Sequence, residues 1–378
     1  MTATKKDPVL VILQLTGAND YLNTVIPYTD PHYRDNRPKV HIPEDQMLRI
    51  DDKLAFRPNM EPLKAIYDDG KMAVIHGIGF ENSPRSHFRA MDIWHTCEPE
   101  IVGTEGWVAK MTRDLDPTGE NVVKTVNFGQ GLPRALALRG TPVTSVSNLE
   151  NYGVLSSVPG VTAEEERDQL LERFARMYAP AVGTGPTMDY LGQTGRDALK
   201  GADIIKSAPE KYSSTIEYAD NPIAKSLRDV ARVYLADLGT QVFYTAHGPF
   251  DTHFNQPPMH TKLWTEVSGA ISDFFADLKE HDAGDNLIMM LFTEFGRRVK
   301  DNGTGTDHGA GGVAFVIGDK VKGGMYGTYP SLKPEDLSQG DLAPNYDFRG
   351  FYSSVIDQWM GLDPVPIVGG KFEEMAFV

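Results

Sequence analysis

Acidic, imidazole and hydroxyl side chains stand next to the ends of several short apolar runs in this 378-residue chain. In an open α/β sheet, ligands bind outside the carboxyl ends of the strands, so such residues can meet at one edge. Carboxylate and imidazole are the usual protein ligands of divalent metals, and a catalytic site leaves one coordination position open. The set as a whole therefore predicts a metal site. The candidate metal ligands are Asp20, Asp251, His253, Glu294, Asp307 and His308, and the candidate catalytic residues beside them are Ser86, His87 and Arg297.

Single pairs within this set are weak signals. Asp251 and His253 lie two residues apart, which places both side chains on one side only where the backbone is extended. Asp307 and His308 offer a carboxylate and an imidazole from one loop. An isolated Asp after a strand often caps a turn, and a lone His is more often a surface or hydrogen-bonded core residue. Only the convergence of several strand ends favours a metal site.

A hydroxyl at a helix start is the second chemical feature. Ser83 and Ser86 precede a helical stretch at 88–95, and free N–H groups at a helix N-terminus favour phosphate or sulfate. Ser is also a preferred N-cap whatever the function, so Ser86 alone leaves both interpretations open. Arg85 and Arg297 are candidate bidentate partners of an oxyanion.

The elements that must position these residues are predicted from hydrophobic patterning. Uniformly apolar runs are typical of strands buried on both faces, as in a mainly parallel sheet covered by helices. The strands expected are Val9–Leu13, Met72–Ile75, Arg134–Leu138 as the weakest, Val242–Thr245, Leu287–Phe292 and Val313–Ile317. The helices expected between them are Glu61–Asp69, Ser86–His95 and Thr261–His281. This alternation predicts an α/β three-layer sandwich with a mainly parallel sheet.

A change of composition marks one internal segment. Glu164–Met177 and Ala224–Leu238 have the propensity and periodicity of helices without an apolar strand between them. We therefore expect a helical insertion at residues 162–238 within a single α/β domain that spans residues 1–378.

Charge and composition limit the partners and the location. The chain has 52 acidic against 37 basic residues, a net charge of −15, which disfavours nucleic acid. No stretch approaches the roughly 20 apolar residues of a membrane span. The single cysteine, Cys97, fits a reducing compartment, so we expect a cytoplasmic protein. A chain whose export leader had been removed would look the same, which leaves a periplasmic or exported location as the alternative. The sequence does not indicate the oligomeric state.

Five blocks in order give a family resemblance: Thr16–Pro27, Arg85–Phe88, Phe250–His253, Thr293–Arg298 and Thr306–Gly309. They resemble the signature blocks of a large uncharacterised bacterial family, often exported by the twin-arginine route, within the alkaline phosphatase and sulfatase superfamily. The resemblance covers nearly the whole chain. It implies an alkaline-phosphatase-like fold that holds one or two divalent ions, of Zn, Mn, Ca or Mg.

The resemblance also implies roles for single residues. It gives a nucleophile position to Ser86, or less readily to Ser83, and metal-ligand positions to Asp20, Asp251, His253, Glu294 and His308. Phe295 occupies the place of a second-metal histidine, so a single-metal site, or a rearranged one that uses Asp307 and His87, fits better than a two-zinc site.

Three functions follow from these expectations. The first is a metal-dependent hydrolase of small anionic phosphate or sulfate esters, with Ser86 or a metal-bound water as nucleophile and Arg297 stabilising charge. The second is a catalytically inactive relative that binds an anionic ligand or a protein partner. The third is a mutase that transfers a phosphoryl group through Ser86.

Overall fold

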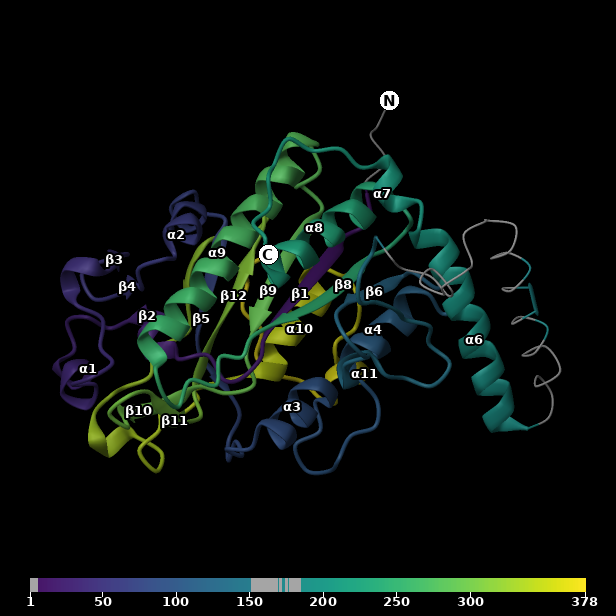
Figure 1. Ribbon diagram of the computed structural model, residues 1–378. Coiled ribbons are helices and arrows are strands. Elements are labelled where there is room, and N and C mark those ends of the chain that lie inside the picture. Colours follow the sequence, from purple (N-terminus) through teal and green to yellow (C-terminus); the bar gives the residue numbers. More distant parts are fainter. Residues whose placement is uncertain (1–5, 151–168, 170–171, 174–175, 177–184) are drawn as a thin grey trace.

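The computed structural model describes residues 6–150, 169, 172–173, 176 and 185–378. In this part of the chain the central layer is a nine-stranded sheet (Figure 1). Its strands are β1 (Val9–Leu15), β5 (Met72–Gly79), β6 (Thr125–Phe128), β7 (Thr144–Val146), β8 (Val242–His247), β9 (Leu287–Phe292), β12 (Gly312–Ile317), β13 (Gly324–Tyr326) and β14 (Tyr346–Asp347). Their order is β13-β5-β12-β9-β1-β8-β6-β7, and β14 pairs with β5.

The direction of β12 decides which residues can meet. Strand β12 pairs antiparallel with both β5 and β9, whereas the other pairings described in this sheet are parallel. The start of β12 therefore lies at the same edge as the carboxyl ends of β1, β5, β8 and β9. This reversal brings the segment that precedes β12, which contains Asp307 and His308, to the edge where the other candidate residues lie.

Helices cover both faces of the sheet. One face carries α2 (Glu61–Asp68), α8 (Pro222–Leu235) and α9 (Gln256–Glu280), and the other carries α3 (His87–Thr96), α4 (Trp107–Leu115), α10 (Phe348–Gln358) and α11 (Val365–Val368). Strand β1 alternates between the two cores, with Val11 and Leu13 in the first and Leu10 and Ile12 in the second. The expected three-layer α/β sandwich with a mainly parallel sheet is confirmed.

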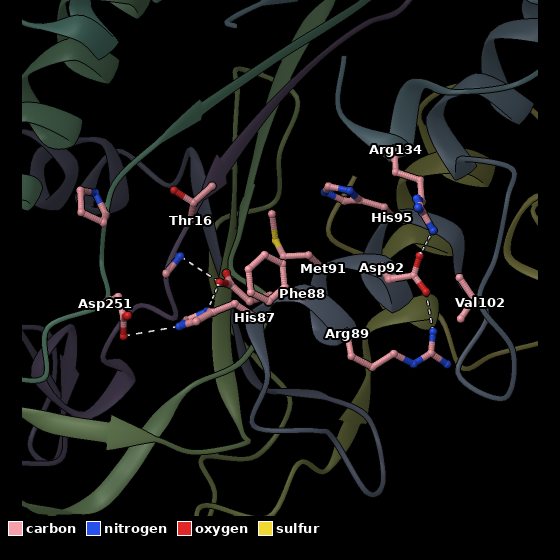
Figure 2. Close-up of a pocket in the computed structure, with 13 residues that line it drawn as sticks. Thr16, His87, Phe88, Arg89, Met91, Asp92, His95, Val102, Arg134 and Asp251 are labelled. Carbon is pink, nitrogen blue, oxygen red and sulfur yellow. Dashed lines mark hydrogen bonds and ion pairs between the residues drawn. The ribbon is translucent and has the colours of Figure 1, made fainter. Parts of the chain in front are cut away.

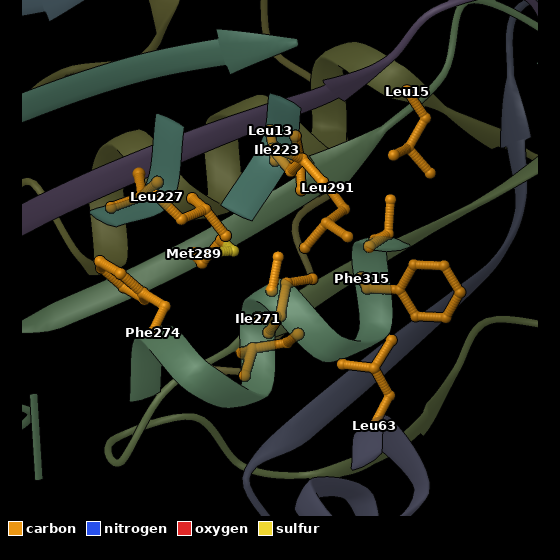
Figure 3. Close-up of a cluster of buried hydrophobic side chains, with 14 of the residues drawn as sticks. Leu13, Leu15, Leu63, Ile223, Leu227, Ile271, Phe274, Met289, Leu291 and Phe315 are labelled. Carbon is orange, nitrogen blue, oxygen red and sulfur yellow. The ribbon is translucent and has the colours of Figure 1, made fainter. Parts of the chain in front are cut away.

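The first core shows how the apolar pattern of the sequence produces this packing (Figure 3). Ile271 and Phe274 of α9 are fully buried against Leu291 of β9 and Leu227 of α8. Ile271 and Phe274, three residues apart in the helix, thus lie on the face of α9 that packs on the sheet. The neighbouring Phe275 is only partly buried.

Smaller elements surround the sandwich. They are α1 (Pro31–Asn36), α6 (Pro186–Ile205), α7 (Ala208–Lys211), a three-stranded sheet of β2 (Val25–Ile26), β3 (Leu48–Arg49) and β4 (Ala55–Phe56), and short 3₁₀ turns at Tyr21–Asn23, Glu44–Gln46, Arg134–Leu136 and Pro334–Asp336. A hairpin of β10 (Arg297–Asp301) and β11 (Thr306–His308) places Arg297 directly opposite His308. None of the helices in the described ranges combines the length and apolar composition that a membrane crossing requires.

One expected strand is wrong. Arg134–Leu138 begins with a 3₁₀ turn, and the third long-sheet strand along the chain is β6. Ala135 and Leu136 are buried, but they pack beside α3 and α4 instead of within the sheet. Their apolar character therefore reflects helix packing. The four-residue β6 contains the polar residues Thr125 and Asn127, so it lacks the uniformly apolar run by which the other strands were predicted.

The expected helical insertion is described only in part. Most of Glu164–Met177 lies outside the described residues. The helix expected at Ala224–Leu238 is α8, which packs closely against α9 in the layer that covers the sheet. The extent of an insertion at 162–238 and the single-domain boundaries stay predictions.

Candidate metal centre

Ligand atoms of His87, Asp251 and His308 lie within 4.8 Å of one another. The first residue of α3 supplies His87, the loop after β8 supplies Asp251, and the last residue of β11 supplies His308. The Nε2 atoms of His87 and His308 are 2.9 Å apart, and they lie 3.4 and 3.1 Å from Asp251 Oδ1. His253 adjoins them, because its Nε2 lies 2.9 Å from His308 Nε2 and 3.1 Å from Asp251 Oδ1.

The hydrogen-bond partner of Nδ1 determines which tautomer each neutral histidine adopts. Every Nδ1 faces an oxygen that can only accept a hydrogen bond, so each neutral ring carries its hydrogen on Nδ1 and a lone pair on Nε2. The three pairs are His87 Nδ1 with Glu294 Oε1 at 2.7 Å, His253 Nδ1 with Asp307 Oδ1 at 2.9 Å and His308 Nδ1 with the Arg85 carbonyl at 2.9 Å.

When the rings are neutral, the Nε2 lone pairs of His87 and His308 and the Asp251 carboxylate oxygen therefore face one another with no proton between them. Such a set repels itself unless a cation lies at its centre. Around a tetrahedral Zn²⁺ with bonds near 2.0–2.1 Å, neighbouring ligand atoms are about 3.3 Å apart. The separations of 2.9, 3.1 and 3.4 Å among His87, Asp251 and His308 match that spacing, so these three residues fit a small divalent cation with one coordination position left open.

Glu294 and Asp307, expected as ligands, lie behind imidazoles instead. Glu294 is buried and also accepts the backbone N–H of Gly17 at 2.9 Å. Its hydrogen bond raises the pKa of His87. The hydrogen bond from His253 lowers the pKa of Asp307. Carboxylates in this position orient the ring and increase its basicity as a ligand.

Asp20 lies outside the cluster. Its carboxylate is fully buried in an ion pair with Arg37 and accepts a hydrogen bond from Gln256. Gln256 Oε1 in turn accepts from the Thr306 hydroxyl at 2.7 Å, and Arg37 Nε donates to the Val299 carbonyl at 3.0 Å. Thr306 and Val299 belong to β11 and β10, so Asp20 supports the hairpin that holds His308.

Arg297 contacts the cluster from its buried side. Its side chain has no exposed surface, and its Nη2 donates to Asp251 Oδ1 at 2.8 Å. Burial alone would raise the pKa of Asp251, but the contact with His308 and the charge of Arg297 outweigh it and hold that pKa below its usual range. Arg297 therefore fixes the Asp251 carboxylate and does not line the cavity beside the cluster.

Ser86 and Ser83 precede α3. Ser86 is the N-cap of α3, is exposed and makes no side-chain capping bond. Ser83 is half-buried three residues earlier. Neither serine lines the cavity beside the cluster.

Two residues at the site were not singled out for these roles by the sequence. Phe295 is buried, stacks on His87 with ring centroids 4.9 Å apart and lies 5.2 Å from the ring of His308. Gly17 has φ +103°, and a Cβ there would lie 2.6 Å from the backbone nitrogen of Asp251. Phe295 thus holds two imidazoles in place, and Gly17 lets the loop after β1 approach the loop of Asp251.

A cavity of about 750 Å³ opens beside the cluster (Figure 2). His87, Asp251 and Glu294 line one end of it. Arg89 and Arg134 line the opposite end. His87 and Asp251 of the cluster are therefore accessible from a space large enough for a small organic molecule.

The chain matches, over residues 144–367, the model of a family described as "Protein of unknown function (DUF1501)". It belongs to this family. The match contains Asp251, His253, Glu294 and His308, whereas His87 precedes it. The expected membership in a family of unknown function is confirmed.

No curated protein matches the chain. Matching solved structures include the C-terminal periplasmic domain of EcEptC from Escherichia coli in complex with Zn, at 11% identity over 98% of this chain and 89% of that one, with a TM-score of 0.46. A putative sulfatase from Bacteroides thetaiotaomicron matches at 12% identity over 98% and 76%, with a TM-score of 0.38. An alkaline phosphatase PafA variant matches at 11% identity over 78% and 64%, with a TM-score of 0.36. At these TM-scores no residue role is transferred, so the roles of residues here follow from this chain's own geometry.

Proposed function

We propose that the protein is a metal-dependent hydrolase of phosphate or sulfate esters. The observation that supports this is the convergence of the Nε2 atoms of His87 and His308 on the Asp251 carboxylate, a three-ligand set that leaves one position of a tetrahedral ion for water. Imidazole-rich sets suit Zn²⁺ and similar transition ions, whereas Ca²⁺ and Mg²⁺ prefer oxygen ligands. One such cluster is found among residues 6–150 and 185–378, so the proposal is for a single ion.

A Zn²⁺ held by this set would supply a Lewis acid and lower the pKa of a bound water to about 7. The chain's own residues prepare the site. Glu294 and Asp307 keep the hydrogens of two imidazoles on Nδ1, so that both Nε2 atoms remain available. The ion pair with Arg297 helps to keep the pKa of Asp251 low and fixes the position of its carboxylate. The N-terminus of α3, which begins at His87, adds a partial positive charge that favours an anionic ester.

The placement of the serines favours water over Ser86 as the nucleophile. Ser86 does not line the cavity into which the cluster opens. We therefore expect Ser86→Ala to keep most of the activity, with Ser83→Ala as the matched control. Phosphate trapped covalently on Ser86 would support the mutase mechanism instead.

A non-catalytic anion-binding role is the second candidate. It is favoured by the burial of Arg297 and the position of Ser86, because neither the expected oxyanion partner nor the expected nucleophile faces the cavity. Both functions use the same cation site and differ only in turnover.

The test is a screen of Zn²⁺-loaded protein on aryl phosphates and aryl sulfates, with His308→Ala and the control His32→Ala, whose imidazole lies in α1. Turnover that His308→Ala abolishes and His32→Ala keeps supports the hydrolase. Zn²⁺ binding without turnover of any ester supports the non-catalytic role. Protein that binds no metal contradicts both.

A further inference from the structure

The cavity beside the cluster has two chemically different ends (Figure 2). His87 and Asp251 lie at one end, and Arg89, Asp92 and Arg134 lie at the other. The side chain of Phe88 is drawn between these two groups. A ligand that fills this space would meet the cation set, an apolar middle and a second charged group in succession.

The far end has an excess of positive charge. Asp92 is shared by two guanidinium groups, since Nη1 of Arg89 and Nη1 of Arg134 each pair with one of its carboxylate oxygens. One carboxylate against two arginines leaves a net charge of +1. This end of the cavity therefore favours an anion.

Arg134 has hydrogen-bonding capacity to spare. Its Nη1 also donates to the Gly103 carbonyl at 3.0 Å, but its Nε and Nη2 have no hydrogen-bond partner among the described residues. Its side chain is 46% exposed. Arg89 is more fully used, because its Nη2 donates to the Pro99 carbonyl at 2.6 Å. Arg134 is thus the group best able to donate to a ligand, and a guanidinium is suited to a carboxylate, sulfate or phosphate.

The neighbouring imidazole adds no charge at this end. His95 lines the cavity but is buried, and its Nε2 lies 3.0 Å from Gln14 Oε1. Burial lowers the pKa of His95 to about 4, so the ring is neutral at neutral pH. The positive charge at this end comes from the arginines alone.

The middle of the cavity exposes apolar side chains. Phe88 is 91% exposed although it is aromatic, and Val102 is 68% exposed. Both line the cavity. Leaving these groups in water loses the free energy that burial would provide, and an aromatic face offers a stacking surface to a flat ligand. An apolar part of a ligand would cover them.

We propose that the cavity binds an amphipathic ester: its reacting phosphate or sulfate lies at the cation set, its aromatic leaving group packs on Phe88, and a second anionic group on that leaving group pairs with Arg134. The reacting end of this assignment rests on the proposed function. The apolar and anionic ends rest on the cavity alone.

Binding of two non-hydrolysable probes to Zn²⁺-loaded protein tests this by isothermal titration calorimetry. Benzylphosphonate provides the ring and one anion, and 4-(phosphonomethyl)benzoate adds a carboxylate across the ring. We expect the second probe to bind at least about tenfold more tightly, since a hydrogen bond to a charged group contributes roughly that factor. Arg134→Gln should reduce the ratio of the two dissociation constants to near one. Arg113→Gln should keep it, because Arg113 pairs with Asp114 on α4 and has an equally exposed side chain.

Phe88→Ala tests the apolar part. We expect it to weaken both aromatic probes about tenfold while the affinity for methylphosphonate, which has no ring, stays as in the wild type. Retained Zn²⁺ binding shows that each variant is folded.

The outcomes separate the two proposals. Equal affinity of the wild type for the two aromatic probes, or an unchanged ratio in Arg134→Gln, overturns the second anion site and leaves the hydrolase proposal standing. Failure of Zn²⁺-loaded wild type to bind any of the phosphonates overturns both.

Discussion

Glu294 accepts the Nδ1 hydrogen of His87 at 2.7 Å, although 207 residues separate them in the chain. Glu294 comes shortly after β9, whereas His87 is the first residue of α3, the helix that follows β5 in the chain. The same relationship recurs between Asp307 and His253 at 2.9 Å. Two carboxylates expected as metal ligands thus accept hydrogen bonds from imidazoles of the cluster.

The first prediction concerns this pairing. Glu294→Gln should weaken Zn²⁺ binding by about 10–100-fold, because a neutral amide orients His87 less firmly and no longer increases its basicity. Competition with a chromogenic chelator measures the affinity. Glu81→Gln, an exposed residue shortly before α3, is the control. Unchanged affinity in Glu294→Gln would show that the buried carboxylate does not act on the site.

The second prediction concerns the ion pair of Asp20 with Arg37. Asp20→Asn leaves a fully buried guanidinium without its counter-charge, so the free energy of unfolding should fall by about 3–5 kcal/mol. Urea denaturation measures the change. Glu44→Gln removes an exposed partner of Arg34 and should cost only about 0–1 kcal/mol. Equal losses in the two variants would contradict a structural role for the buried pair.

The third prediction concerns acid stability. Burial lowers the pKa of His76 to about 4, against an ordinary value of 6.5. As the pH falls below about 6.5, the unfolded chain binds this proton and the folded chain does not, so the stability that is present above that pH is lost down to about pH 4. The loss from this group is of the order of 3 kcal/mol.

His76→Gln should therefore show a shallower fall in the free energy of unfolding between pH 7 and pH 4.5, measured by urea denaturation at each pH. His32→Gln, at a half-buried position of α1, is the control and should follow the wild type. A pH dependence of His76→Gln that coincides with the wild type would refute the assignment.

The fourth prediction uses two glycines with positive φ. Gly17→Ala forces a Cβ to within 2.6 Å of the Asp251 nitrogen, whereas at Gly70, with φ +72°, a Cβ meets nothing within 4 Å. Gly70→Ala should thus cost only backbone strain of about 1 kcal/mol. Gly17→Ala should cost more and also weaken Zn²⁺ binding, because the loop of Asp251 must move. Equal stability and metal affinity in the two variants would argue against this close approach.

The layers of the fold were predictable because their signal is local. Leu287–Phe292 is apolar at every position and forms β9 with the expected bounds. In α9 the buried apolar residues, such as Val267, Ile271 and Phe274, recur at helical spacings of three and four. The weak run Arg134–Leu138 misled because apolar residues that pack beside helices have the same local composition as a short strand.

The location of the site was predictable from the sequence, but the role of each residue in it was not. Strand-end residues were expected to meet, and Asp251, His253 and His308 do. Which carboxylate faces a cation depends on long-range partners: Arg37 pairs with Asp20, and the antiparallel course of β12 sets the position of Asp307. No pattern within a few residues of Asp20 or Asp307 contains that information.

Metal content tests the central proposal most directly. Protein purified without chelator, or dialysed against Zn²⁺ and then against buffer, should contain about one equivalent of a transition ion per chain by inductively coupled plasma mass spectrometry, as expected for a single ligand set. The His87→Ala/His308→Ala double variant should lose it, and His32→Ala should keep it. Wild-type protein that takes up none of Zn²⁺, Mn²⁺ or Ca²⁺, or a double variant that binds as much metal as the wild type, would contradict the account.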